Sequence, residues 1–289
     1  MATLRDLKRQ ITSIKNIAKV TEALQTVSAV KFRKAEARVK KARPYAENVE
    51  QMMRDVARGA SANTPLLAGG EVRTVLVASI TADRGLAGGF NAQILRRTIQ
   101  FRGEQSADLA QVASGRKAVA FFRFRRIGLE EVYTGFSDSP TYEKAREIGG
   151  ALTRHFDDEE ADEVYLIYNR FESALTQKPV VKRLLPVAPE DGEGENGEET
   201  SASYIEYVPD PETVLRRLVP RYVETMVWQA LLESAAGEHG ARMTAMKSAT
   251  DNANDLAKEL TLAMNKARQA QITQEILEIV GGAEALAAG

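Results

Sequence analysis

Apolar residues recur at steps of three and four near both ends of the chain. At the N-terminal end they form the stripe of an amphipathic helix over about residues 3–58, at Leu4, Leu7, Ile11, Ile14, Ile17, Val20, Leu24, Val27 and Val30. Near the C-terminal end the alternating steps predict a coiled-coil seam, at Met246, Ala249, Ala253, Leu256, Leu260, Ala263, Ala267 and Ala270. Both ends are therefore predicted to be long helices.

Helix-breaking residues are concentrated between these two ends. All 9 prolines lie from Pro44 to Pro220, and no glycine precedes Gly59. Pro44 is expected to kink the first helix or split off its last part, and Pro220 to kink the second. The second helix is predicted to start at Asp210-Pro211-Glu212, where Asp is a good N-cap, and to end at the glycine pair 281–282 as a C-cap.

The length of the second helix predicts its partner. At 1.5 Å per residue it would span roughly 100 Å, which is too long to bury its stripe against a small compact domain. The N-terminal helix is the one candidate in this chain that is long enough to cover it. The two termini are therefore predicted to pair as an antiparallel coiled coil.

The middle of the chain, about residues 70–208, has an α/β pattern. Strands are expected at 72–81, 108–114, 127–136 and 163–171, and helices at 91–97, 116–124 and 140–156. Segment 178–187 is predicted to be an edge strand because Pro179 and Pro186 cannot donate ladder hydrogen bonds. Strands that alternate with helices imply a mostly parallel sheet. The acidic, glycine-rich segment 190–202 is expected to be a solvated loop.

The predicted fold class is thus α/β with long helices, in which a Rossmann-like α/β domain is inserted between the two arms of a coiled coil. Three parts are expected: the N-terminal helix (1–60), the α/β domain with its acidic loop (70–208), and the C-terminal helix (210–289).

Composition narrows the chemistry. The 289 residues carry a net charge of −1, with 0 Cys and 2 His. The lack of cysteine excludes disulfides, thiolate catalysis, Cys-ligated zinc and iron–sulfur clusters, and two histidines make a multi-His metal site improbable. We therefore expect no cofactor and no metal. The apolar runs are too short to span a membrane, and no secretory signal is apparent at the N-terminus.

A glycine-rich turn, Asp83-Arg84-Gly85-Leu86-Ala87-Gly88-Gly89, follows the first predicted strand and precedes a helix. That layout can cradle a phosphate. The spacing G-x-x-G-G is not a dinucleotide fingerprint, however, and no Walker sequence occurs. The favoured interpretation is a tight turn that packs against another surface. Asp83 and Arg84 lack a neighbouring base or nucleophile that would indicate catalysis.

Four other features are not expected to take part in catalysis, metal binding or nucleic-acid binding. His155 is expected at a solvated helix end and His239 exposed on the long helix. The acidic runs 157–163 and 190–199 lack a cation-binding spacing. Residues 1–58 carry 14 Lys and Arg against 6 Asp and Glu, which favours a solvated or protein-facing helix over a nucleic-acid contact because aromatic residues are sparse. No catalytic residues are expected in this chain.

Four segments resemble the gamma subunit of F-type ATP synthases, the central rotor shaft. They are IKNIAKVTEALQTVSAVKFRKAE (14–36) with ARPYAE (42–47), TADRGLAGGFN (81–91), a stretch within 207–253 that includes LLESAAGEHGARMTAMKSATDNA, and NKARQAQITQEILEIVGGAEAL (265–286). The resemblance covers essentially the whole chain and is weakest over 100–200.

The resemblance implies a central-stalk rotor that transmits rotation of the membrane ring to the catalytic hexamer and so couples proton flow to ATP synthesis and hydrolysis. It implies as partners the α and β subunits, the epsilon subunit and the membrane rotor ring, with no nucleic acid. It also implies a peripheral location at the cytoplasmic face of the bacterial inner membrane. Nucleotides bind elsewhere in that complex.

The resemblance also assigns contact residues. Arg268, Gln269 and Thr273, with Leu24, match positions that touch a β subunit. The helix end through Ile276, Ile279 and Val280 matches the part held in an apolar sleeve. In the family the α/β domain forms a foot on the membrane ring together with the epsilon subunit, and Tyr204 and Tyr207 fall in that foot.

Two other functions remain open from the residues alone. One is a soluble nucleotide-binding regulator that uses the turn Gly85–Gly89. The other is a scaffold coiled coil that binds nucleic acid through its basic N-terminal helix.

Overall fold

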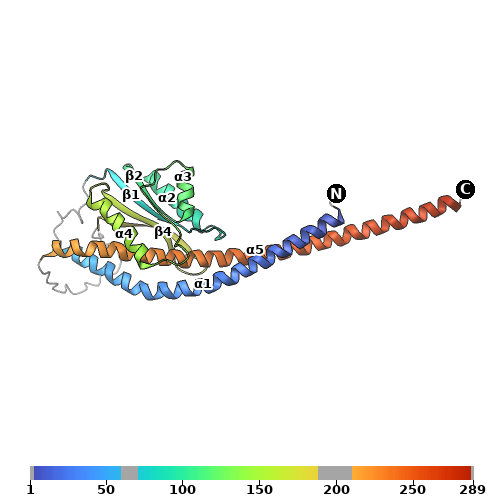
Figure 1. The fold of residues 1–289 in the computed structure, drawn as a ribbon, viewed down its shortest axis with the longest axis horizontal. Coiled ribbons are helices and arrows are strands. Elements are labelled where there is room, and N and C mark those ends of the chain that lie inside the picture. The colour runs from blue at the N-terminus through green and yellow to red at the C-terminus, as the bar shows by residue number, and fades with distance from the viewer. Residues whose placement is uncertain (1–2, 60–70, 188–209, 288–289) are drawn as a thin grey trace, which may run out of the picture. The chain divides into compact units, whose positions relative to one another are not determined.

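A computed structural model describes residues 3–59, 71–187 and 210–287 (Figure 1). The elements in chain order are α1 (Leu4–Gly59), β1 (Thr74–Ile80), α2 (Phe90–Glu104), β2 (Asp108–Ser114), α3 (Arg116–Phe124), β3 (Glu131–Tyr133), α4 (Tyr142–Asp157), β4 (Glu163–Phe171), β5 (Gln177–Leu185) and α5 (Pro211–Ala287). The predicted acidic loop 190–202, with Tyr204 and Tyr207, lies outside the described residues.

The chain divides into two compact units. The helical unit combines Met1–Val27 with Met243–Gly289, and the α/β unit comprises Ser28–Arg242. Each long helix contributes to both units, since α1 and α5 run through the two boundaries. The α/β unit holds all the strands of the described chain.

One five-stranded sheet forms the centre of the α/β unit, in the order β3-β2-β1-β4-β5. The pairs β1–β2, β1–β4 and β2–β3 are parallel, whereas β4–β5 is antiparallel. The mostly parallel sheet and the edge position of β5 are confirmed. The strand predicted over 127–136 is shorter, since β3 spans three residues between Arg126 and Gly135, which both have positive φ and so leave the extended conformation.

Helices cover both faces of this sheet. One face packs against α2 and α3, in clusters that include Phe90, Ile94 and Phe122. The opposite face packs against α4 and against the segments of α1 and α5 that belong to this unit, with Met53, Leu152 and Val223 among the buried residues. In Figure 1 these α1 and α5 segments lie side by side along the sheet. A helix pair is thus part of the core of the α/β unit.

The ends of the two long helices only partly follow the prediction. The α5 start is confirmed: Asp210 Oδ1 accepts a hydrogen bond of 2.8 Å from Thr213 N. Pro44 does not divide α1, which continues to Gly59, and α5 runs on through Pro220. The C-cap predicted at Gly281 and Gly282 is wrong, because neither has a positive φ and strong helix formers such as Ala and Leu carry α5 to Ala287.

In the helical unit the two helices pair in opposite directions, as predicted (Figure 1). Thr21 Oγ1 and Thr250 Oγ1 share a hydrogen bond of 2.7 Å across the pair. The residues buried between the helices are Leu7, Ile11 and Ala18 from α1 and Met246, Ala253 and Ala257 from α5. The three alanines among them, Ala18, Ala253 and Ala257, allow the two helix axes to approach closely.

The apolar stripe predicted for α1 and the seam predicted for α5 are each buried at only some of their positions. In α1, the side chains of Ile17, Val20 and Val27 are more than half exposed. In α5, Leu256 is nearly half exposed, whereas the next residue, Ala257, is buried. A paired helix buries a narrow row at steps of 3.5 residues, whereas the apolar stripe on each helix is wider than that row. The remainder of the stripe faces away from the partner helix.

We predict that Gly115 is required at the turn between β2 and α3. Its φ is +93°, and a Cβ there would lie 2.2 Å from Thr81 O. Gly115→Ala should therefore lower the free energy of unfolding by more than about 1 kcal/mol, as measured by urea denaturation. Gly103→Ala in α2, where nothing lies within 4 Å of the new Cβ, is the control and should raise it by up to about 1 kcal/mol. Equal stability of the two variants would contradict this assignment.

Candidate functional site

The glycine-rich turn after β1 is organised by the carboxylate of Asp83. Its Oδ1 accepts a hydrogen bond from Arg116 N (3.0 Å), and its Oδ2 accepts from Gly135 N (2.9 Å) and Ser137 N (3.0 Å). Burial raises the pKa of Asp83, but these backbone hydrogen bonds outweigh it and hold the pKa below its usual range. Asp83 thus ties the end of β1 to the loops that follow β2 and β3.

The hydrogen bonds and the charge of Asp83 do not favour phosphate binding at this turn. Three backbone N–H groups at this edge of the sheet, those of Arg116, Gly135 and Ser137, already donate to Asp83. The negative charge of Asp83 would also repel an anion. The turn does not support the nucleotide-binding alternative.

The turn instead packs against α5, as the favoured interpretation predicted. Arg242 donates to Gly85 O from Nε (3.3 Å) and from Nη2 (3.2 Å). The same guanidinium lies 2.6 Å from Glu238 Oε1, one helical turn earlier. Glu238 is 1% exposed and Arg242 8% exposed. A buried ion pair on α5 therefore holds the turn, and we call Glu238, Arg242 and Gly85 the clamp.

His239 is buried beside the clamp, so its predicted exposure is wrong. The side chain is 2% exposed, and Nε2 lies 3.1 Å from Asp138 O. Asp138 in turn pairs with Lys31 Nζ at 2.5 Å. Burial lowers the pKa of His239, against the opposing effect of the Asp138 carbonyl and the neighbouring carboxylates. The imidazole therefore stays neutral to lower pH than a solvated one.

Two glycines explain why a histidine between them is buried. A Cβ on Gly237 would lie 3.0 Å from the Phe90 ring, and one on Gly240 would lie 3.1 Å from Ala174 O. These glycines let α5 pass close to the sheet and its loops. Glycines three residues apart in an otherwise continuous helix are the sequence signal that could have revealed this contact.

The other residues considered for chemistry are dispersed. Arg84 is exposed at the tip of the turn. His155 lies in the last turn of α4, with Nδ1 2.6 Å from Glu160 Oε2 and a half-buried ring. In the described part of the chain no group of three His, Asp or Glu side chains is placed to hold a metal ion. No helix among the described residues is long and apolar enough to cross a membrane.

The residues that the resemblance assigned to partner contacts lie mostly on the final part of α5. Arg268, Gln269 and Thr273 are exposed, and Thr273 Oγ1 donates to Gln269 O at 2.9 Å. Ile276, Ile279 and Val280 are 54%, 72% and 52% exposed. Leu24 on α1 is half-buried. These side chains are therefore not brought together into one pocket.

Comparison with known proteins settles the family. The ATP synthase family model matches residues 3–286. An ATP synthase gamma chain from Rubrobacter xylanophilus is 69% identical over 290 residues, and the match covers 100% of both chains. One from Pelotomaculum thermopropionicum is 47% identical and covers 99% of this chain and 100% of the relative.

This chain belongs to the ATP synthase gamma chain family.

Solved structures agree with the gamma-chain fold. A chain of the Euglena gracilis mitochondrial ATP synthase matches with a TM-score of 0.70 at 18% identity, over 99% of this chain and 95% of that one. A chain from the central stalk and c-ring of the Tetrahymena thermophila enzyme matches with a TM-score of 0.60 at 22% identity, over 80% and 99%. At such identities the likeness concerns the fold alone.

We predict that the clamp depends on its buried ion pair. Arg242→Met leaves the Glu238 carboxylate buried without its cation, which should cost about 3–5 kcal/mol in the free energy of unfolding. Adding Glu238→Gln should recover part of that loss. Lys258→Met removes an exposed ion pair of the same helix, with Asp255, and should leave the free energy of unfolding close to that of the unmodified chain. Urea denaturation measures all four proteins, and a small effect of Arg242→Met would contradict the clamp.

We also predict that His239 makes stability pH-dependent. Because its pKa is lower in the folded chain than in the unfolded chain, the unfolded chain binds more protons between the two values. Stability should therefore be fully present above about pH 6.5 and decline as the pH falls below it. His239→Gln should remove this component from denaturation midpoints measured between pH 5 and pH 8, and His155→Gln should keep it. Identical pH profiles for His239→Gln and the unmodified chain would refute the prediction.

Proposed function

We propose that this chain is the central-stalk rotor subunit of an F-type proton-translocating ATP synthase. In this role it transmits rotation of the membrane ring to the catalytic hexamer of α and β subunits, and it couples proton flow to ATP synthesis and hydrolysis. Full-length similarity to curated gamma chains and the match of fold to chains of ATP synthase assemblies support this proposal.

The exposed end of α5 is the observation that carries the proposal. Every side chain from Arg268 to Ala283 is exposed. Several of them are large and apolar, including Ile272, Ile276, Leu277, Ile279 and Val280. A helix that presents so much apolar surface beyond its coiled-coil partner is expected to be covered by another protein. A sleeve in the catalytic hexamer would provide that cover.

The polar residues before this apolar end are suited to an acidic partner. We infer that Arg268, Gln269 and Thr273 contact a loop of a β subunit, and that Leu24 of α1 faces a β subunit elsewhere along the helix pair. A guanidinium and an amide donate several hydrogen bonds in fixed directions, which fits a carboxylate-bearing loop. Apolar contacts through Ile276, Ile279 and Val280 lack such direction and would allow rotation inside the sleeve.

The exposed part of the α1 stripe supports a second contact. Ile17, Val20 and Val27 lie outside the row that pairs with α5 and are 52%, 59% and 53% exposed. Lysines and arginines surround them, among them Lys15 and Lys19. This mixture fits a protein surface that is both apolar and acidic better than it fits bulk water.

The clamp has a mechanical role in this account. Torque that enters at the sheet must reach the helix pair that packs on it within the α/β unit. The Arg242 hydrogen bonds to Gly85 O and the close packing at Gly237 fix the sheet to α5 there. A buried pair that is satisfied on both sides resists sliding better than apolar contacts alone.

Other parts of the proposal concern location and partners. The foot would contact the epsilon subunit and the membrane ring, with Tyr204 and Tyr207 in that region. The chain would lie peripherally at the cytoplasmic face of the bacterial inner membrane. It is a subunit of an enzyme complex, and we infer that it supplies no catalytic residues of its own.

We predict that the double variant Arg268→Ala, Gln269→Ala weakens assembly or ATPase activity of the purified complex. Loss of two or more charge-assisted hydrogen bonds to the β subunit should reduce turnover or complex yield by about tenfold or more. Lys258→Ala, an exposed cation that already pairs with Asp255 on the same helix, is the matched control. Turnover and assembly equal to the unmodified complex would refute the contact.

We predict that the isolated chain does not hydrolyse ATP and that its glycine-rich turn does not bind ATP, ADP or NAD. The reason is that the carboxylate of Asp83, at the start of the turn, accepts hydrogen bonds from the backbone of Arg116, Gly135 and Ser137 and would repel an anion at this edge of the sheet. Isothermal titration calorimetry of the purified chain measures binding, and a phosphate-release assay measures hydrolysis. Saturable nucleotide binding that is lost in a Gly88 variant would favour the regulator instead.

A further inference from the structure

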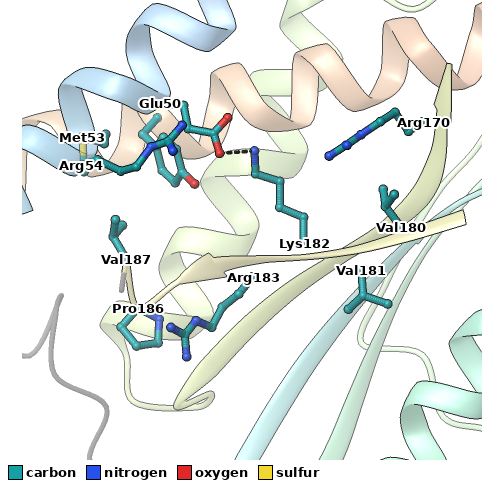
Figure 2. Close-up of a pocket in the computed structure, with 11 residues that line it drawn as sticks. Glu50, Met53, Arg54, Arg170, Val180, Val181, Lys182, Arg183, Pro186 and Val187 are labelled. Carbon is teal, nitrogen blue, oxygen red and sulfur yellow. Dashed lines mark hydrogen bonds and ion pairs between the residues drawn. The ribbon is translucent and has the colours of Figure 1, made fainter. Parts of the chain in front are cut away.

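A concave site lies between the edge of the sheet and the helix pair in the α/β unit (Figure 2). Its volume is about 300 Å³. The lining residues come from α1, α5, β4 and β5 and include Glu50, Arg54, Tyr222, Arg170 and Lys182. We call it the β5 cavity. Volumes of this order are at the lower end of those that bind small molecules.

The side chains of β5 alternate between this cavity and the opposite face of the sheet. Lys182 faces the helices, with Nζ 2.7 Å from Glu50 Oε1 and 3.2 Å from Met226 Sδ. Arg183, the next residue, lies near Glu163 Oε1 at 3.5 Å. In Figure 2 its guanidinium points away from Glu50 and Lys182. Both residues belong to the lining of the cavity, but only Lys182 turns its charged end toward Glu50 and the helices.

Positive charge gathers within the cavity. Its lining holds one carboxylate, that of Glu50, and four cationic residues: Arg54, Arg170, Lys182 and Arg183. Figure 2 shows the charged ends of Arg170 and Lys182 pointing toward each other across the cavity. Glu50 pairs with Lys182, and within the described residues no carboxylate forms an ion pair with Arg170. Two cations that face each other across open space favour an anion between them.

The neighbouring Tyr168 forms a side-chain hydrogen bond with Arg170 but brings no charge to it. Burial, together with the charge of Glu233, raises the pKa of Tyr168 to about 12. Its hydroxyl is therefore neutral at physiological pH and cannot serve as a counter-charge for Arg170.

A second hollow of about 360 Å³ adjoins the β5 cavity and shares Glu50, Arg170 and Lys182 with it. Arg43, Glu47, Glu172 and Glu233 also line it, and Arg43 pairs with Glu233. The three carboxylates outnumber this cation and would repel an anion, which limits a ligand to the β5 cavity and therefore to a small size.

We propose that the β5 cavity binds a small oxyanion, inorganic phosphate or a phosphate ester, between Arg170 and Lys182. The planar guanidinium of Arg170 suits two oxygens of one phosphate group, and the ammonium of Lys182 donates to a third. This site lies apart from the glycine-rich turn and does not depend on the rotor proposal.

The test is isothermal titration calorimetry of the full chain in a phosphate-free buffer of low ionic strength, with inorganic phosphate and pyrophosphate as probes. We expect saturable binding to one site. Arg170→Gln should weaken it at least about tenfold, because it removes the bidentate donor. Arg183→Gln is the matched control and should bind as the unmodified chain does, because the guanidinium of Arg183 points away from Glu50 and Lys182 although the residue belongs to the lining.

Thermal unfolding gives a second readout that does not require heat of binding. Phosphate should raise the melting temperature of the unmodified chain and of Arg183→Gln, but not that of Arg170→Gln. No saturable binding of either probe would overturn the proposal. Equal binding by Arg170→Gln and the unmodified chain, or equal losses in the Arg170 and Arg183 variants, would overturn it as well, because the effect would then be one of net charge.

Discussion

The buried ion pair between Glu238 and Arg242 is the interaction on which this fold most depends. It places a charged group of α5 inside the α/β unit, where burial is tolerated only because the guanidinium also donates to Gly85 O. The same contact explains the glycine-rich turn: the Asp83 carboxylate holds the backbone of the loops that follow β2 and β3, and the Gly85 carbonyl of the turn accepts from α5. Sheet and helix pair are thereby one mechanical body within that unit.

Helix length sets the second constraint. A helix of 77 residues has more apolar surface than the α/β unit can cover, and α1 covers part of the rest in the helical unit. Small residues at the pairing positions, such as Ala18, Ala253 and Ala257, keep that contact narrow. Narrow pairing leaves apolar residues exposed on both helices, and such residues are available to other subunits. A stiff rod with free apolar flanks is what a shaft inside a protein bearing needs.

Local pattern was sufficient to predict much of the fold. The strands β2 and β4, helix α3 and the Asp210 cap were predictable because alternation, helical period and cap chemistry act within a few residues. What failed depends on the tertiary partner. The side of each stripe that is buried, the shortness of β3 and the burial of His239 all follow from which surface packs against it. The failure at Gly281 and Gly282 has a local cause instead, because the residues around them favour helix and carry α5 past both glycines.

In the candidate site, too, local sequence predicted some features, whereas others depend on residues far away in the chain. The spacing of the glycine-rich turn was enough to predict that it packs against another surface. Its partner, Arg242, lies 157 residues away in sequence and could not be deduced from the local pattern. The contact residues on α5 came from resemblance to the family, because an exposed polar side chain carries no local signal of its partner. The β5 cavity had no sequence signal either, since α1, β4, β5 and α5 each contribute only a few of its residues.

Rotation of the chain inside its complex tests the central claim most directly. The sequence contains 0 Cys, so one cysteine introduced at Leu175, which is 79% exposed in the α/β unit, would be a unique attachment point for a visible marker. With the hexamer fixed to a surface, ATP should drive continuous rotation of the marker in one direction. A complex that hydrolyses ATP while the marker stays still would contradict the assignment of this chain as the rotor shaft.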